Sequence, residues 1–329
     1  MIPEHDSPSN PLVVIFGGAG YIGSPLSRQL LEEGYRVRVF DNLLYGDHGL
    51  HNLEQEGFEF VHGDICDTKA VTSDCKGAET VILLSTLAGR RFRNEKNNEE
   101  MRTINLLASS VVVDAAVEHG AERFIFASTE AVYGAQSGIM YETTTPSPVS
   151  LYARLKLRME ERVLAAKKRE FHPVCLRLPT CYGYSERMRF DLLPNTFIRD
   201  AVYRKKINVI SGEQWRPMLH VEDAARAFLS CVKAHANLVN GEIFNVGDKD
   251  QNYQVKQVAQ IVKNTVPETE VIVEEETPDL VDYNLSCTKI SKVLDFAPAL
   301  SLEDSMARLR DLLSSGSFGN AYSLKYQNN

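Results

Sequence analysis

The sequence predicts an α/β protein with a doubly wound parallel sheet and a smaller C-terminal region. Through the first half of the 329 residues, short apolar runs alternate with longer amphipathic stretches, which indicates strands alternating with helices. A parallel sheet covered by helices on both faces produces this alternation. After about residue 180 the alternation stops, loops lengthen, and prolines and charges increase. We therefore expect a second region there, interleaved with the first.

The predicted elements follow one another along the chain. The apolar run LVVIFG at 12–17 predicts the first strand, and the amphipathic stretch after it predicts a helix that ends at Gly34. Further strands of the sheet are expected at 36–41, 58–64, 80–85, 123–129 and 173–179. Helices are expected at 105–120 and 150–168, and short strands of the second region at 207–212 and 270–276. We divide the chain into a first domain at 11–180, a second region at 181–313, and loose termini at 1–10 and 314–329.

The composition excludes several classes of partner. The net charge of -8 argues against a surface for nucleic acid or for anionic membranes. The six cysteines form no close pairs, and neither they nor the eight histidines show metal-ligand spacing, so we expect free thiols and no bound metal. The polar N-terminal stretch lacks the apolar core of a signal peptide, and no later run is long enough to span a membrane. We therefore expect a cytoplasmic protein.

A glycine-rich stretch, FGGAGYIG at 16–23, follows the first predicted strand and opens the first helix. Its glycines have the spacing at which a chain turns tightly and its backbone approaches a pyrophosphate at the helix N-terminus. Asp41 ends the next strand, where an acid would hold a ribose diol and repel a 2′-phosphate. Asp64 ends a further strand and would either contact the adenine amino group or cap a helix. The sequence therefore predicts a Rossmann-type fold that binds NAD through Gly17, Gly20, Tyr21, Ile22, Gly23, Asp41, Asn42, Asp64 and Ile65.

Tyr152 and Lys156 lie four residues apart in SLYARLK, so on a helix both side chains project from one face. A phenol titrates near ~10, and a neighbouring ammonium and an oxidised nicotinamide would both favour the phenolate that serves as a base. This spacing is also typical of an exposed surface pair. The glycine-rich turn, and Thr129 at the end of the strand 123–129, favour hydride transfer.

Together these motifs resemble those of the extended short-chain dehydrogenase/reductases that act on nucleotide sugars. The resemblance runs from about residue 11 to residue 312 and includes GGAGYIGS, GDICD, STEAVYG, LYARLK, LRLPTCYG, WRPMLHVED and IFNVGD. It implies that Tyr152 is the catalytic base, that Lys156 binds the nicotinamide ribose, and that Thr129 takes the place of the usual Ser/Thr. It also implies an architectural role for His220 and a cofactor cleft lined by Leu84, Ser85 and Thr86. The substrate-binding residues that it implies are Thr86, Thr129, Thr180, Asn195 and Arg216.

The chain departs from the family's pattern where phosphate is bound. Thr180 stands where many members carry an Asn that touches the substrate phosphate. The stretch EETPDLVDYN has no arginine where many members place a second phosphate ligand, so diphosphate binding depends on Arg216 and on other basic groups. The run GRRFRNEK, which contains Arg90, Arg91 and Arg93, is a candidate source of such groups, although a solvated charge run is the more frequent case.

Glu130 is a candidate catalytic residue that separates the family's reactions. In the family that the chain resembles, the 4,6-dehydratases carry Thr-Asp-Glu at this position and use the two carboxylates as acid and base. This chain has Thr129, Glu130 and Ala131 instead. Loss of water needs one proton removed beside the ketone and another given to the leaving hydroxyl, which one carboxylate does less easily. A 4-epimerase needs neither, and the small Ala131 would let the 4-keto sugar turn. We therefore favour an NAD-dependent nucleotide-sugar 4-epimerase, with a 4-ketoreductase, a 4,6-dehydratase or a non-catalytic dinucleotide sensor as alternatives.

The helices near 98–118 and 150–168 carry apolar residues on more than one face, which is more than a single sheet face can bury. In the family that the chain resembles, these two helices form a four-helix bundle across a two-fold axis. The resemblance therefore implies a homodimer that binds a nucleoside-diphosphate sugar.

Overall fold

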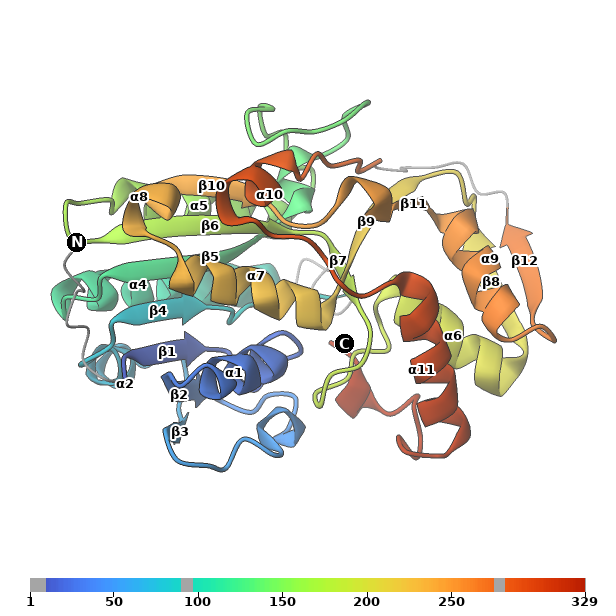
Figure 1. The fold of residues 1–329 in the computed structure, drawn as a ribbon, viewed down its shortest axis with the longest axis horizontal. Coiled ribbons are helices and arrows are strands. Elements are labelled where there is room, and N and C mark those ends of the chain that lie inside the picture. Colours follow the sequence, from blue (N-terminus) through green and yellow to red (C-terminus); the bar gives the residue numbers. More distant parts are fainter. Residues whose placement is uncertain (1–9, 90–96, 275–281, 329) are drawn as a thin grey trace, which may run out of the picture.

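A parallel sheet of seven strands forms the centre of the computed structural model, which describes residues 10–89, 97–274 and 282–328. The strand order is β10-β6-β5-β4-β1-β2-β3, and every neighbouring pair is parallel (Figure 1). The order reverses between β1 and β4, which makes that point the expected binding crevice of a doubly wound sheet. The predicted fold class is confirmed. The strands of this sheet are β1 (Leu12–Phe16), β2 (Arg36–Asp41), β3 (Phe58–His62), β4 (Thr80–Leu83), β5 (Arg123–Thr129), β6 (His172–Leu178) and β10 (Glu242–Asn245).

Helices cover both faces of the sheet (Figure 1). One face carries α1 (Gly23–Glu32) and α7 (Val221–Lys233), and the other carries α2 (Thr68–Asp74), α4 (Ser109–Glu118) and α5 (Leu151–Ala165). Helix α4 continues directly from α3 (Asn98–Arg102) and the π-helical segment Thr103–Ala108. Alternate residues of β1 enter two separate apolar clusters, because successive side chains of a strand point to opposite faces. The uniformly apolar sequence of β1 thus reflects burial on both faces.

The rest of the chain forms two small sheets and a group of helices beside the carboxyl ends of the large sheet (Figure 1). Helices α6, α9 and α11 pack on one another, and β10 returns to the large sheet beside β6. One small sheet contains β7 (Thr180–Tyr182), β9 (Trp215–His220) and β11 (Asn252–Gln254), and the other contains β8 (Lys206–Ile210) and β12 (Glu270–Glu274). The helices of this group are α6 (Leu193–Arg204), α9 (Val255–Thr265) and α11 (Leu302–Ser314), whereas α8 (Ala236–Val239) and α10 (Thr288–Leu294) contact β10 of the large sheet.

The segment after α11 corrects the expectation of a loose C-terminus. The side chains of Phe318, Ala321 and Tyr326 are buried. The rings of Phe318 and Tyr326 both meet the ring of Phe190 edge-on, at centroid distances of 5.0 and 5.6 Å. The Phe190 N–H also donates to the Tyr326 carbonyl at 2.8 Å. These aromatic contacts outweigh the small polar residues that suggested a mobile tail.

None of the helices within the described residues combines the length and the apolar sequence needed to cross a bilayer. Residues 1–9, which were expected to be loose, lie outside the described part of the chain.

Candidate active site

A cleft of about 320 Å³ lies at the carboxyl ends of the large sheet's strands. Asp64 is the one predicted cofactor residue that does not line it. The exposed Asp64 carboxylate instead accepts a hydrogen bond from the Cys66 N–H at 2.8 Å, while Asp67 caps α2. The structure therefore brings together nearly all of the cofactor residues chosen from the sequence, namely Gly17, Gly20, Tyr21, Ile22, Gly23, Asp41, Asn42, Ile65, Leu84, Ser85, Thr86, Tyr152 and Lys156.

The glycine-rich turn has the shape that a diphosphate requires. Gly17 has φ +85°, and a Cβ there would lie 2.6 Å from the main-chain nitrogen of Ser85. A Cβ on Gly23 would lie 2.5 Å from the Gly18 carbonyl oxygen, whereas one on Gly20 would approach only the Gly17 carbonyl, at 3.1 Å. No side chain caps the N-terminus of α1 among the described residues, and the positive end of the helix dipole there favours an anionic ligand.

Asp41 ends β2 and faces the cleft. One carboxylate oxygen accepts from the Ala19 N–H at 3.1 Å and the other from the Leu43 N–H at 2.9 Å. Burial raises the pKa of Asp41, and these two hydrogen bonds oppose the rise. A carboxylate oxygen has two lone pairs, so each keeps one for a ribose hydroxyl. The Asp41 carboxylate and the glycine turn, whose glycines have no side chains to obstruct a diphosphate, together fit the adenosine half of NAD.

Tyr152, Lys156 and Thr129 meet in the cleft, as the sequence predicted. The Ser150 hydroxyl caps α5 and so fixes the first turn, which carries Tyr152. The Lys156 Nζ donates to the Ala127 carbonyl at 2.7 Å and lies 5.8 Å from the centroid of the Tyr152 ring. The helix therefore positions the phenol and the amine side by side, close to the end of β5.

The electrostatics at Tyr152 differ from the expectation that Lys156 activates the phenol. Burial raises the pKa of Tyr152 to about 12, and the Arg189 guanidinium and a hydrogen bond with Thr129 oppose the rise. Burial lowers the pKa of Lys156 to about 7, although Glu160 opposes that fall. A buried amine is therefore only partly charged at neutral pH. Arg189 is the protein cation that most favours the phenolate, and sequence reasoning did not select it.

Glu130 follows Thr129 and lines the same part of the cleft. Its Oε1 accepts from the Thr180 hydroxyl at 3.4 Å, and its buried Oε2 has no hydrogen-bond partner among the described residues. Burial raises the pKa of Glu130 to about 8, and the Arg216 charge opposes the rise. Glu130 is therefore largely a protonated acid at neutral pH. Ala131 does not line the cleft, which removes the argument that its small side chain lets a sugar turn.

Asn195 was predicted to bind the substrate, and the structure places it elsewhere. Its Nδ2 donates to the Tyr21 hydroxyl at 3.1 Å and to the Arg189 carbonyl at 2.9 Å, and its Oδ1 accepts from the Gly183 N–H at 3.0 Å. The side chain is fully buried and lies outside the cleft lining. Asn195 therefore fixes the loop after β7 against the glycine turn, and it has no free group for a substrate.

Arg216 lies outside the cleft lining but close enough to Glu130 for the two charges to interact. It donates to the Trp215 carbonyl at 2.7 Å and packs over the Tyr283 ring at 5.5 Å. Thr86 and Thr180 do line the cleft. The arginine run proposed as a further phosphate site, Arg90, Arg91 and Arg93, lies outside the described residues.

His220 has the architectural role that the resemblance implies. Its Nδ1 accepts from the Glu222 N–H at 3.1 Å at the start of α7, and its ring meets the edge of Tyr182 at a centroid distance of 5.5 Å. Burial and the charges of Arg308 and Arg226 lower the pKa of His220 to about 4. The imidazole therefore stays neutral and remote from proton transfer.

The loop between β7 and α6 supplies two charged cleft residues that the sequence analysis missed, Arg187 and Arg189. The signal available was a pair of arginines two residues apart, shortly after a strand that ends at the cleft edge. Such a pair is common on exposed loops, so the sequence alone did not distinguish it from a solvated charge run.

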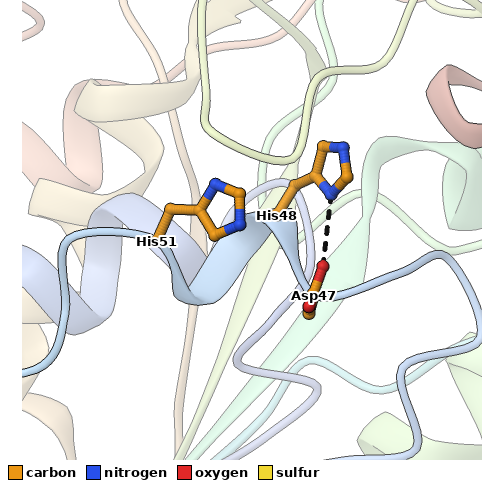
Figure 2. A group of neighbouring side chains, drawn as sticks. All are labelled: Asp47, His48 and His51. Atoms are coloured by element: carbon orange, nitrogen blue, oxygen red, sulfur yellow. Dashed lines mark hydrogen bonds and ion pairs between the residues drawn. The ribbon is translucent and has the colours of Figure 1, made fainter.

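One group of side chains outside the cleft has ligands for a metal ion, although the sequence predicted none. Asp47, His48 and His51 lie on one 3-10 turn, and their ligand atoms lie within 4.8 Å of one another (Figure 2). The two nitrogens of His48 are already engaged, with Asp47 at 3.4 Å and with the Lys325 Nζ at 3.3 Å. Because the Lys325 ammonium would repel a dication, we assign to His48 the role of a contact for the C-terminal segment.

The fold and the cleft define an α/β enzyme that binds a dinucleotide at the carboxyl ends of a doubly wound sheet. The chain matches the model of the NAD dependent epimerase/dehydratase family over residues 13–247, and it belongs to that family. It is an NAD-dependent enzyme of the extended short-chain dehydrogenase/reductase type, as the motifs predicted, and its cofactor is NAD.

Three known proteins show the range of this similarity. An uncharacterized UDP-glucose epimerase, YtcB, of Bacillus subtilis is 27% identical over 92% of this chain and 98% of its own length. A dTDP-D-glucose 4,6-dehydratase of Mus musculus is 30% identical over 82% of this chain and 77% of its own. The solved structure of MoeE5 in complex with UDP-glucuronic acid and NAD is 25% identical, has a TM-score of 0.79, and covers 92% of this chain and 99% of that one. These relatives include both epimerases and dehydratases.

Proposed function

We propose that the protein is an NAD-dependent 4-epimerase that acts on a nucleoside-diphosphate sugar through a 4-keto intermediate. The observation that carries the proposal is the single carboxyl group, that of Glu130, beside Tyr152 and Thr129 among the described cleft residues. The other carboxylate of the described lining, that of Asp41, belongs to the ribose site at the far end. Elimination of water uses an acid and a base, whereas 4-epimerisation needs only one group that takes and returns the same proton.

The chain's residues divide the work at carbon 4 of the sugar. Tyr152 accepts the proton of the 4-hydroxyl and later returns it to the 4-keto oxygen, so the residue ends each turnover unchanged. Thr129 hydrogen-bonds the same oxygen, while Arg189 favours the charged form of Tyr152. Lys156 keeps N–H donors for the ribose hydroxyls beyond the one that it gives to Ala127. Bound NAD supplies the acceptor and the source of the hydride.

The substrate class rests on the relatives and on one basic residue. The named relatives act on UDP- or dTDP-sugars, and MoeE5 was solved with UDP-glucuronic acid. Arg216 is the residue that we assign to the substrate diphosphate, because a guanidinium binds phosphate through paired, charge-assisted hydrogen bonds. Its position near Glu130 sets it at the sugar end of the site rather than at the adenosine end.

A 4,6-dehydratase is the second candidate, because a specific observation favours it. Burial raises the pKa of Glu130 to about 8, so the carboxyl is largely protonated at neutral pH and has a proton to give to a leaving hydroxyl. One carboxyl would then have to remove the proton beside the ketone as well. The 30% identity to the mouse dehydratase keeps this candidate open.

Glu130→Gln separates the two candidates, because Gln keeps the size of Glu but cannot exchange a proton at neutral pH. For a 4-epimerase, we expect the variant to turn over at a modestly reduced rate and to give a product of unchanged mass. For a dehydratase, the variant would accumulate NADH and a 4-keto sugar that retains its 6-hydroxyl. The measurement is absorbance at the NADH band together with mass analysis of the sugar, with Thr180→Val as a control for loss of the hydrogen bond to Glu130.

A further inference from the structure

Arg187 lines the cofactor cleft although only 3% of it is exposed. Within the described chain it forms no ion pair, and its buried Nε has no hydrogen-bond partner. Burial and the neighbouring Arg189 lower the pKa of Arg187 to about 10, so the guanidinium still carries its charge at neutral pH. Asp191 and Asp41 act on this charge, but neither forms an ion pair with it among the described contacts. A buried charge that lacks a direct partner is costly, so an anion that meets Arg187 from outside the chain would stabilise it.

Arg189, the second arginine of the loop, differs from Arg187 because it has an ion-pair partner. The Nε and Nη2 of Arg189 donate to the two oxygens of Asp191 at 3.1 and 2.6 Å. Arg189 therefore has an ion-pair partner within the protein. Of the two arginines, Arg187 is therefore the one whose charge is not compensated by an ion pair.

The position of Arg187 indicates which anion would meet it. Two residues earlier in the loop, the Ser185 hydroxyl donates to the Tyr21 carbonyl at 2.8 Å, and the Tyr21 hydroxyl donates to the Gly183 carbonyl at 2.7 Å. The loop is thus fixed to the glycine turn at the N-terminus of α1. The charge of Arg187 also acts on Asp41, the ribose ligand. The anionic part of NAD between the ribose and the glycine turn is its diphosphate.

The end of the chain holds Arg187 in this place. The Asn328 Oδ1 accepts from the Arg187 Nη2 at 2.6 Å, and the main-chain N–H of Asn328 donates to Asp191. Gly89, with φ +122°, allows the approach, because a Cβ there would lie 2.1 Å from the Asn328 carbonyl oxygen. On another side the guanidinium packs over the Tyr45 ring, 4.3 Å from its centroid. Asn328, the last described residue, accordingly lines the cofactor cleft.

We propose that Arg187 is a further ligand of the cofactor diphosphate and that the C-terminal segment, residues 316–328, is a clamp that positions it. The Phe190, Phe318 and Tyr326 rings anchor this segment. The proposal depends on NAD as the cofactor and holds whichever sugar is the substrate, so it stands or fails separately from the epimerase assignment.

Calorimetric titration of NAD into Arg187→Gln tests the first part. We expect the dissociation constant for NAD to rise roughly tenfold to a hundredfold, as for loss of a hydrogen bond to a charged group. The dissociation constant for NADP should rise by the same factor. Arg169→Gln, an equal change of charge at an exposed position, should bind NAD as the wild type does. An unchanged NAD affinity, or a loss confined to NADP that places Arg187 at a 2′-phosphate, would overturn the proposal.

The second part is tested by coupling between the two residues. Asn328→Ala should weaken NAD binding in the wild type and add nothing in the Arg187→Gln background, because its effect passes through Arg187. Bound NAD should also slow removal of the last residues by a carboxypeptidase in the wild type, a measurement that needs no variant. Independent, additive losses in the double variant, or digestion that NAD does not slow, would refute the clamp.

Discussion

At the residue scale, the proposed hydride transfer depends on the phenol of Tyr152. Tyr152→Phe should abolish turnover, because the phenol is the group that we assign to take the 4-hydroxyl proton, and Glu130, the other proton-exchanging group beside Thr129 among the described cleft residues, is largely protonated at neutral pH. Thr129→Val should slow turnover by roughly 2–4 kcal/mol in the barrier, as for loss of one hydrogen bond to a developing charge. Single-turnover formation of NADH measures both effects. Substantial NADH formation by Tyr152→Phe would show that another group is the base.

A second prediction at the residue scale concerns the pH dependence of folding stability, because the carboxyl of Glu130 is buried. Its folded pKa, about 8, lies above the ordinary value of 4.5, so between these two values the folded state binds more protons than the unfolded state. The stabilising contribution of Glu130 is therefore complete at low pH and is lost as the pH rises through this window. Melting curves of wild type and Glu130→Gln should converge at the acid end and diverge toward pH 8, with the variant the more stable. Parallel curves would contradict the raised pKa.

At the element scale, a buried ion pair fixes α5 to β6 behind the cleft. The Arg177 Nη2 lies 2.7 Å from the Glu160 Oε2, and both side chains are 2% exposed. Glu160 is one helical turn beyond Lys156, and Arg177 also donates to the Tyr133 hydroxyl at 2.9 Å.

Glu160→Ala would leave the Arg177 charge buried and unpaired, so it should lower the free energy of unfolding by about 3–5 kcal/mol. Urea denaturation measures this, and the exposed Glu161→Ala is the matched control, expected to change stability by less than about 0.5 kcal/mol. Equal stability of the two variants would mean that the pair does not fix the helix.

The helices and strands also differ from the contacts between distant segments in how far the sequence predicts them. The strands and their polar ends were predictable, because apolar runs that stop at Gly17, Asp41 and Thr129 mark the edge of a parallel sheet. The spacing of Tyr152 and Lys156 showed that they share a helix face, but it carries no information on burial, which shifts both pKa values. Proximity between segments distant in the sequence, as for Arg187 and Asn328, arises only on packing. The clamp was therefore not predictable from local patterns.

At the scale of the whole molecule, we expect a homodimer. The helical stretch from α3 to α4 presents Leu107 with 62% of its surface exposed, and the family resemblance implies that this stretch contributes to a contact across a two-fold axis. Light scattering at micromolar concentration should therefore give twice the mass of the 329-residue chain. Leu107→Glu, which places a charge in that contact, should shift the protein toward the monomer. A wild-type monomer at this concentration would refute the expectation.

The reaction that we propose interconverts the two configurations at carbon 4 of a nucleotide sugar. The most direct test is mass analysis of the product that the wild-type enzyme forms from UDP- and dTDP-hexoses with NAD, in water and in deuterium oxide. Because Tyr152 exchanges only a hydroxyl proton and the hydride returns to carbon 4, we predict a product of unchanged mass with no carbon-bound solvent deuterium. A product lighter by one water, or one that carries solvent deuterium on carbon, would contradict the claim.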